Sequence, residues 1–282
     1  MKIVEKINQK SKNFETNNKI IQGLWIQGEL SLMEQLSIKS FLANNHEYHL
    51  YIYDDVKNIP PGTVVKDGNE ILPENRIFTY QSGWGQGSYA GFADLFRYHL
   101  LNSKGGWWTD TDIICLKPFD FNSEYVISSS YEGKWGEIAN NCVLKLPKES
   151  EFTKHLVQES DEQDPSQIKF GETGPHLVQK AVRKFNYQNY VVSYQAFCPI
   201  TWRAVKKMAY TEEKLTFDKA ITQAKDWLRP LLKPQTKPGR ITKQSYAVHL
   251  WNEIWRQNQL NKNGIYDQKC LYECLKDRYM ES

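Results

Sequence analysis

Long hydrophobic runs are missing from this 282-residue sequence. Its longest apolar stretches, residues 48–53 and 113–116, are far too short to cross a lipid bilayer. The first nineteen residues are polar and lack the apolar core of a signal peptide. The sequence therefore predicts a cytoplasmic protein and disfavours an integral membrane protein.

Cysteine is scarce, and its five positions show no paired C-x-x-C spacing. An odd number of unpaired cysteines disfavours a disulfide framework, and their spacing disfavours a structural zinc site. We therefore expect reduced thiols, most of them in the core. The positions are Cys115, Cys142, Cys198, Cys270 and Cys274.

A strong net charge is also absent, since the formal value is only +3. No basic stripe accompanies a nucleic-acid motif, so the sequence predicts no nucleic-acid partner. One local exception lies in residues 203–243, where lysine and arginine far outnumber the acids. That stretch fits a solvated helical face, or peripheral contact with an anionic membrane on its inner side or with an acidic acceptor.

Strand and helix patterns alternate along the chain, and no internal repeat or low-complexity tract interrupts them. This order predicts an α/β fold with one catalytic domain over residues 1–282. Strands are expected at 20–25, 48–53, 107–116, 125–130 and 141–146, and helices at 29–42, 88–103, 151–159, 173–185 and 215–232. In such sheets ligands bind at the carboxyl ends of strands.

Aromatic residues make up 13% of the sequence, including nine tryptophans. This content exceeds what core packing usually requires. Because flat rings stack on sugars and bases, the composition favours a carbohydrate partner.

Asp110 and Asp112 form an Asp-x-Asp pair at the end of a predicted strand. In an extended segment two such carboxylates point to the same side and can share one cation. Hard Mn²⁺ or Mg²⁺ prefers carboxylate oxygens and can neutralise a diphosphate leaving group. Taken alone, the pair is more often a surface turn or a strand end.

Asp94 and Arg97 lie three residues apart on the preceding predicted helix, so they share one face. An acid there suits ribose hydroxyls, and a guanidinium suits sugar or phosphate. The alternative is an ordinary ion pair on the helix surface, worth a few tenths of a kcal/mol.

These residues stand within one extended signature. Phe92-Ala93-Asp94-Leu95-Phe96-Arg97 and Gly105-Gly106-Trp107-Trp108-Thr109-Asp110-Thr111-Asp112 together resemble the Asp-x-x-Arg and Gly-Gly-x-Tyr/Trp-x-Asp-x-Asp elements of the Asp-x-Asp sugar-binding-region glycosyltransferases. That family includes fungal outer-chain mannosyltransferases, globotriaosylceramide synthase relatives, bacterial capsule glycosyltransferases and, more distantly, the catalytic domains of clostridial toxins. The resemblance implies a GT-A fold with a Rossmann-like nucleotide-binding sheet, and retention of anomeric configuration.

The resemblance also implies roles for single residues. Asp112 matches the direct metal ligand, and Asp110 matches its partner toward metal and ribose. Asp94 matches the family aspartate at the nucleotide and sugar, and Arg97 the arginine that faces donor sugar and phosphate. Asn141, in an Asn-Cys-Val-Leu-Lys-Leu-Pro run, resembles a family element beside the donor sugar. A polar residue that simply starts a strand explains this position equally well.

Three further segments extend the resemblance. Trp25 and Gln27 lie where relatives hold the uracil base, although the usual Ile-Pro-Lys-x-Ile-His opening is absent. Gly174-Pro175 resembles a turn that opens a helix near the acceptor cleft. His249 and Trp251 resemble a His-x-Trp segment that folds over the donor, with His249 completing the metal shell and Trp251 excluding water. By this reading residues 19–120 bind the nucleotide-sugar, residues 121–260 face the acceptor, and residues 261–282 form a tail.

The sequence thus predicts a metal-dependent hexosyltransferase. It would move a hexose or N-acetylhexosamine from a UDP-sugar to a saccharide or glycolipid acceptor, in capsule or surface polysaccharide synthesis. Two other classes stay open: a catalytically silent nucleotide-sugar or carbohydrate-binding module, and an Asp-x-Asp phosphatase. The phosphatase is disfavoured because its nucleophilic aspartate normally lies near the amino terminus, and because it has no use for Asp94 and Arg97.

Overall fold

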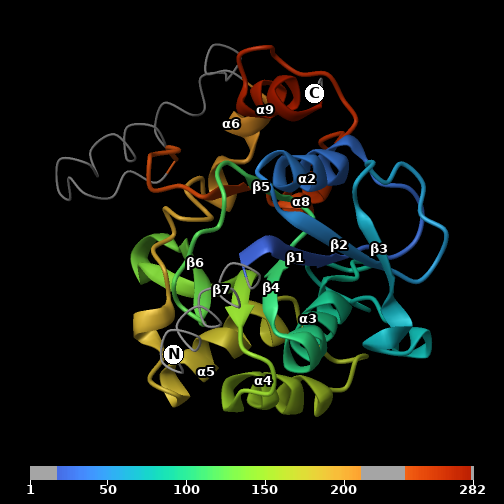
Figure 1. Cartoon of the computed structure of the whole chain (residues 1–282), viewed down its shortest axis with the longest axis vertical. Coiled ribbons are helices and arrows are strands. Elements are labelled where there is room, and N and C mark those ends of the chain that lie inside the picture. Colours follow the sequence, from blue (N-terminus) through green and yellow to red (C-terminus); the bar gives the residue numbers. More distant parts are fainter. Residues whose placement is uncertain (1–17, 211–238, 281–282) are drawn as a thin grey trace, which may run out of the picture.

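A mixed six-stranded sheet forms the centre of the protein, in the order β3-β2-β1-β4-β7-β6 (Figure 1). The computed structural model describes residues 18–210 and 239–280. The strands are β1 (Ile20–Leu24), β2 (Glu47–Ile52), β3 (Val64–Asp67), β4 (Gly106–Thr109), β6 (Val126–Tyr131) and β7 (Glu137–Leu146). β1, β2, β3 and β4 run parallel to one another, whereas β7 is antiparallel to both β4 and β6. The predicted α/β class, with a Rossmann-like parallel half, is confirmed.

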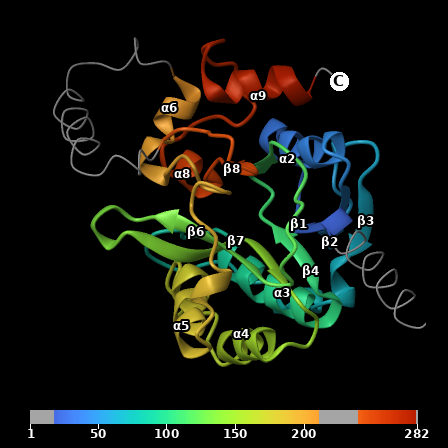
Figure 2. The ribbon, with the colours of Figure 1, turned by 60° about the vertical axis from the view of Figure 1, so that its left-hand side comes forward.

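Helices cover both faces of this sheet (Figures 1 and 2). One face carries α3 (Ala90–Lys104), α4 (Glu151–Asp161) and α5 (Leu177–Lys184). The other side carries α2 (Leu32–Ala43), α6 (Lys206–Ala209), α8 (Asn252–Gln257) and α9 (Leu271–Tyr279). A small sheet of β5 (Ile113–Cys115) and β8 (Ala247–His249) lies beside α2. Single-turn helices span Gly68–Glu70, Glu74–Arg76, Gly133–Trp135, Glu172–His176, Gln188–Tyr190 and Trp202–Ala204.

The two faces have separate aromatic-rich cores, which explains the abundance of large rings. Phe92 and Phe96 of α3 pack with Trp108 on one face. Phe41 of α2 and Trp107 both contact Phe119 on the other. Trp107 and Trp108 point to opposite faces because side chains alternate along a strand. Burying both rings fixes the register of β4, and with it the position of the acids that follow.

The predicted strand over residues 107–116 is wrong in one respect. β4 ends at Thr109, and β5 begins at Ile113 in the other sheet. Between them the chain turns, and the Ile113 amide donates to the Asp110 carbonyl (3.2 Å). The two strands pair with different partners, β7 and β8, and this tertiary pairing overrides the continuous β-rich pattern. Asp110 and Asp112 therefore lie in a turn, not in an extended strand.

Residues 211–238 lie outside the described part of the chain, and with them the predicted helix at 215–232 and most of the basic 203–243 stretch. Among the helices that the structure describes, none has both the length and the hydrophobicity to span a bilayer. All five cysteines are free thiols, and only Cys274 is exposed, which confirms the prediction of reduced thiols mostly in the core.

Helix α2 begins with a capping box. The Ser31 hydroxyl accepts from the Met33 amide (3.2 Å), and Glu34 accepts from the Ser31 amide (2.8 Å). Further along α2, the Ser37 hydroxyl donates to the Ile113 carbonyl (2.6 Å), the residue after Asp112. The capping box therefore stabilises α2, the helix to which the residue after the acidic turn is hydrogen-bonded.

We expect Ser31→Ala to lower the free energy of unfolding by about 1 kcal/mol, because the first turn of α2 loses a hydrogen-bond acceptor. Urea denaturation measures this change. Ser31→Thr keeps the hydroxyl and serves as the control, with stability near that of the parent protein. Equal losses in both variants would contradict the capping role.

Candidate functional site

A cavity of about 810 Å³ opens where β1 and β4 end. This volume lies within the range of small-molecule sites, and the position is the one where α/β sheets bind ligands. Its wall combines residues from far apart in the chain, including Trp25 after β1, Asp94 on α3 and Asn141 on β7. The cavity therefore forms only when the segments that carry Trp25, Asp94 and Asn141 are folded together.

Arg97 occupies the centre of a buried charge network. Its guanidinium lies 3.2 Å from Asp94 Oδ1 and 3.1 Å from Asp110 Oδ1. It also donates to the Asn141 carbonyl (2.6 Å). Arg97 is only 3% exposed, so the pair with Asp94 is not the surface ion pair considered above. In this arrangement Arg97 holds two carboxylates, and its donors are directed at protein acceptors.

The two acids of the Asp-x-Asp pair have different environments. Burial, together with the nearby Asp112 charge, raises the pKa of Asp110 to about 7, although Arg97 opposes this shift. Asp110 also accepts a bond from the Trp108 indole (2.9 Å). For Asp112 burial acts in the same direction, but the charge of His249 and the hydrogen bonds from His249 and the Asn252 amide together outweigh it, so the pKa of Asp112 is lowered. Asp112 is therefore the acid that is held ionised.

Asp112 uses only one of its two carboxylate oxygens. Oδ2 accepts from the Asn252 amide (2.7 Å) and faces His249 Nε2 at 3.2 Å. Oδ1 is buried, and within residues 18–210 and 239–280 no group donates a hydrogen bond to it. A buried carboxylate oxygen without a donor is costly unless something positive occupies the space in front of it. This oxygen is the feature of the site that calls for a cation.

Ligand atoms of Asp110, Asp112 and His249 all lie within 4.8 Å of one another. Two carboxylates with one imidazole suit Mn²⁺ or Mg²⁺ with open positions for phosphate and water. The chemistry of the donor set and the orphaned oxygen of Asp112 both fit such an ion. For His249, burial lowers the pKa, but the charges of Asp112 and Cys142 and the hydrogen bonds to them together outweigh it, so the pKa is well above its usual range. Any ion bound at Nε2 would have to displace that proton.

Asp94 is positioned by three neighbours. Asn141 donates to its Oδ1 (2.7 Å), and Thr173 donates to its Oδ2 (3.1 Å). Gly174 lies so close that a Cβ there would come within 2.9 Å of Asp94 Oδ2. Glycine is therefore required in the Thr-Gly-Pro turn for the turn to approach the acid. Burial raises the pKa of Asp94, while Arg97 and these hydrogen bonds oppose the shift.

The remaining predicted residues differ in their placement. Trp25 and Trp251 both line the cavity. The Trp251 ring stacks on His249 with a centroid distance of 3.9 Å, and its indole donates to the Ile200 carbonyl (2.8 Å). Gln27 is exposed and lies outside the cavity lining, where it accepts a bond from the Tyr89 hydroxyl (2.8 Å). The structure thus brings together every predicted site residue except Gln27.

Several cavity residues were not predicted from the sequence. Trp84 stands in a glycine-rich loop, is 46% exposed and contacts Phe170 edge-on at 4.1 Å. Gly83 and Gly85, its neighbours, both have positive φ. An aromatic ring between glycines in a loop was a usable signal, because it cannot be a core residue of a helix or strand. Other unpredicted lining residues include Tyr80, Tyr89, Asn140, Trp202 and Arg256.

Comparisons with known proteins agree with this site. The model of the glycosyltransferase sugar-binding region containing a DXD motif matches residues 32–131, and that of the alpha 1,4-glycosyltransferase conserved region matches residues 146–279. Together they include the acidic turn, α3 and the β8 segment. Both models describe glycosyltransferases, and the chain is a glycosyltransferase.

Solved structures with similar folds include three transferases. The PaToxG glycosyltransferase is 15% identical, with a TM-score of 0.42, over 93% of this chain and 95% of that one. The glycosyltransferase GlyE of Streptococcus pneumoniae is 13% identical, with a TM-score of 0.41, over 94% of this chain and 63% of that one. A transferase mutant is 10% identical, with a TM-score of 0.39, over 62% and 86% of the two chains. No curated protein sequence matches significantly.

We expect Arg97→Met to lower the free energy of unfolding by about 3–5 kcal/mol, because Asp94 and Asp110 would then lie buried without their cation. Chemical denaturation at neutral pH measures the loss. Arg76→Met is the matched control, since Arg76 pairs with Asp161 (2.9 Å) where both side chains are partly exposed. There the expected loss is about 1 kcal/mol or less. Similar losses in the two variants would contradict the central role of Arg97.

Proposed function

We propose that this glycosyltransferase moves a hexose or N-acetylhexosamine from a UDP-sugar to a saccharide or glycolipid acceptor, with the help of Mn²⁺ or Mg²⁺. The observation that carries the proposal is the buried, partnerless Oδ1 of Asp112 beside Asp110 in the large cavity. A divalent cation bound there would neutralise the diphosphate as it departs. The ligand role of His249 stays a prediction.

The protein residues around that position have distinct tasks in the proposal. Arg97 and Trp108 fix Oδ1 of Asp110, which leaves the other oxygen of that carboxylate for a ligand. Asn141 and Thr173 fix Asp94, whose carboxylate can accept hydrogen bonds from sugar hydroxyls. Trp251 covers His249 and keeps water away from that side of the site. Because these groups are held before substrate binds, little reorganisation is needed.

The carboxylates of the described cavity lining favour retention without a covalent enzyme intermediate. Asp94, Asp110 and Asp112 are held by the buried contacts given above. The remaining acid of the lining, Glu253, is paired with Arg256 at 2.6 Å. In the proposal each of these carboxylates is held by a neighbour or, like Oδ1 of Asp112, faces the cation, which makes it a poor nucleophile. We therefore favour attack by the acceptor hydroxyl on the face from which the diphosphate leaves, with that phosphate taking the proton.

A donor panel tests the proposal. UDP-galactose, UDP-glucose and UDP-N-acetylhexosamines are incubated with the full chain and Mn²⁺ or a chelator, and released UDP is measured. We expect cation-dependent release, and we expect Asp112→Asn to reduce it at least about a hundredfold, because the orphaned carboxylate oxygen is replaced in a preorganised site.

Asp161→Asn is the control for that variant, because Asp161 is a partly exposed acid bound to Arg76 and His99, away from the cavity. It should keep full turnover. Unchanged turnover in Asp112→Asn would refute the metal site. Binding of UDP with cation but no release from any donor would instead favour the silent binding module.

We propose further that Trp84 provides a stacking surface for the saccharide acceptor. Trp84→Ala should raise the acceptor KM about fivefold or more, because an aromatic contact of this kind is worth about 1 kcal/mol. Trp135→Ala is the control, since Trp135 is 70% exposed but lies outside the cavity lining. Steady-state kinetics at saturating donor measures both. An unchanged acceptor KM in Trp84→Ala would contradict the assignment.

A further inference from the structure

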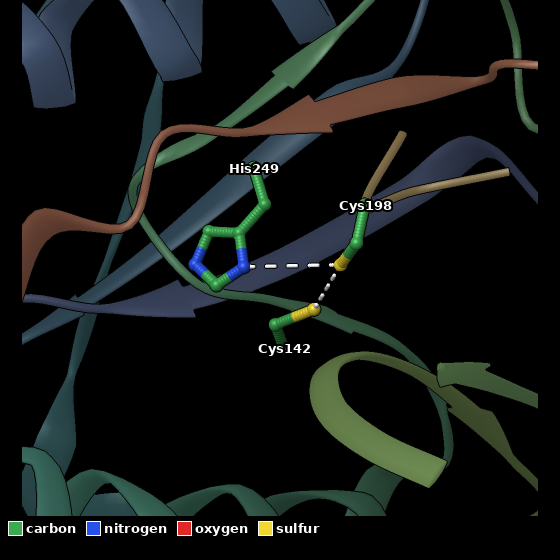
Figure 3. A group of neighbouring side chains, drawn as sticks. All are labelled: Cys142, Cys198 and His249. Carbon is green, nitrogen blue, oxygen red and sulfur yellow. Dashed lines mark hydrogen bonds between the residues drawn. The ribbon is translucent and has the colours of Figure 1, made fainter. Parts of the chain in front are cut away.

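Directly behind the acidic site lies a second group of ligating side chains, Cys142, Cys198 and His249 (Figure 3). Cys142 belongs to β7, His249 to β8, and Cys198 to the loop that follows Tyr194. All three are buried, with exposures of 1%, 0% and 7%. Neither cysteine lines the cavity, so the reaction proposed above makes no use of the pair.

The spacing of the three groups matches a tetrahedral metal site. The two sulfurs are 3.6 Å apart, and Cys198 Sγ lies 3.9 Å from His249 Nδ1. With bonds of about 2.3 Å to sulfur and 2.0 Å to nitrogen, a tetrahedral zinc ion separates its ligands by about 3.8 Å (S to S) and about 3.5 Å (S to N). The two observed distances differ from these values by only a few tenths of an ångström, and all three ligand atoms lie within 4.8 Å of one another.

The two ring nitrogens of His249 face different groups. Nδ1 is directed at the sulfurs, as Figure 3 shows, while Nε2 faces Asp112 Oδ2 at 3.2 Å. A histidine that binds a metal through one nitrogen commonly donates its other N–H to a carboxylate, which fixes the tautomer and the ring orientation. Asp112 already stands in that position.

We propose that Cys142, Cys198 and Nδ1 of His249 form a zinc site behind the catalytic cavity. Two thiolates balance the charge of Zn²⁺, and a water molecule completes four-coordination, as in other sites with three protein ligands. The neutral ring then donates Nε2–H to Asp112 Oδ2 and leaves Oδ1 for the hard cation. His249 thereby becomes a positioning residue for Asp112, and the zinc joins β7, β8 and the 198 loop.

The linear spacing of the cysteines argues against such a site, but the fold overrides it. Cys142 and Cys198 are 56 positions apart, and Cys198 and His249 are 51 apart. The Tyr246 and Ala247 amides donate to the Ala196 carbonyl (2.7 and 3.0 Å), and these bonds hold the loop of Cys198 beside β8. Soft thiolates select zinc, whereas the carboxylates nearby select a harder ion, so the two sites need not compete for one metal.

Cobalt substitution tests the proposal by a property that only sulfur ligation produces. The full chain is purified with zinc present, its metal content is measured by mass spectrometry, and the zinc is then exchanged for Co²⁺. We expect one zinc ion per chain, and a sulfur-to-cobalt charge-transfer band in the near ultraviolet. Cys142→Ser and Cys198→Ser should each lose bound zinc, whereas Cys274→Ser, which changes the exposed thiol, should keep both zinc and band.

Asp110→Asn separates this proposal from the proposed function. It should lose turnover while it keeps the zinc and the charge-transfer band, because Asp110 contacts neither sulfur. Failure of the parent chain to retain zinc, or a cobalt spectrum without the sulfur band, would overturn the zinc site. So would a Cys142–Cys198 disulfide in protein purified under reducing conditions. The cobalt spectrum of the parent chain decides the matter even if a serine variant does not fold.

Discussion

The ion pairs of Arg97 with Asp94 and Asp110 are the constraint on which the catalytic site depends. Two carboxylates in a nonpolar interior would otherwise repel each other and take up protons. One nitrogen of the guanidinium, Nη2, faces both carboxylates, while Nη1 donates to the Asn141 carbonyl; a lysine has no such fixed fork of donors. The contact with the Asn141 carbonyl ties α3 to β7. The Arg97 guanidinium thus sets the positions of both acids and also joins α3 to the sheet.

A second link joins the acidic turn to the end of the chain. Asp112 accepts from the Asn252 amide, and the Leu250 amide donates to the Asp112 carbonyl (3.0 Å). These bonds fasten β8 and α8 over the turn, so Trp251 is carried into the cavity wall in a left-handed conformation (φ 63°). The site residues of β8 and of the acidic turn therefore depend on each other for their positions, although they lie more than a hundred positions apart.

The sequence predicted those structural elements that are determined by residues close together in the chain. The helix that carries Asp94 and Arg97 was predicted from the spacing of its apolar residues. Gly105 follows its last residue with a positive φ, a conformation that glycine adopts readily. The path of the chain from Asp110 to Asp112 did not follow, because strand pairing with β7 and β8 decides where β4 stops. Cys198 and Trp84 carried no periodic signal at all. Their significance arises only from contacts with Cys142 and Phe170, and such long-range contacts leave no spacing rule in a single sequence.

The two matched models identify the reaction as glycosyl transfer. The residues of the cavity bear on a separate question, which is how different sugars could be accommodated. In the proposed function the acids bind features that all nucleotide-sugars share, namely a diphosphate, through the cation, and vicinal hydroxyls. Discrimination between hexoses must therefore come from other groups, since one hydroxyl contact can decide between epimers only where a polar group is left unpaired by the wrong sugar. Asn140 and Gly171 line the same cavity and differ from the acids in carrying no charge. We therefore expect donor choice to depend on neutral residues near the charged centre, which can vary without disturbing the buried network that Arg97 holds.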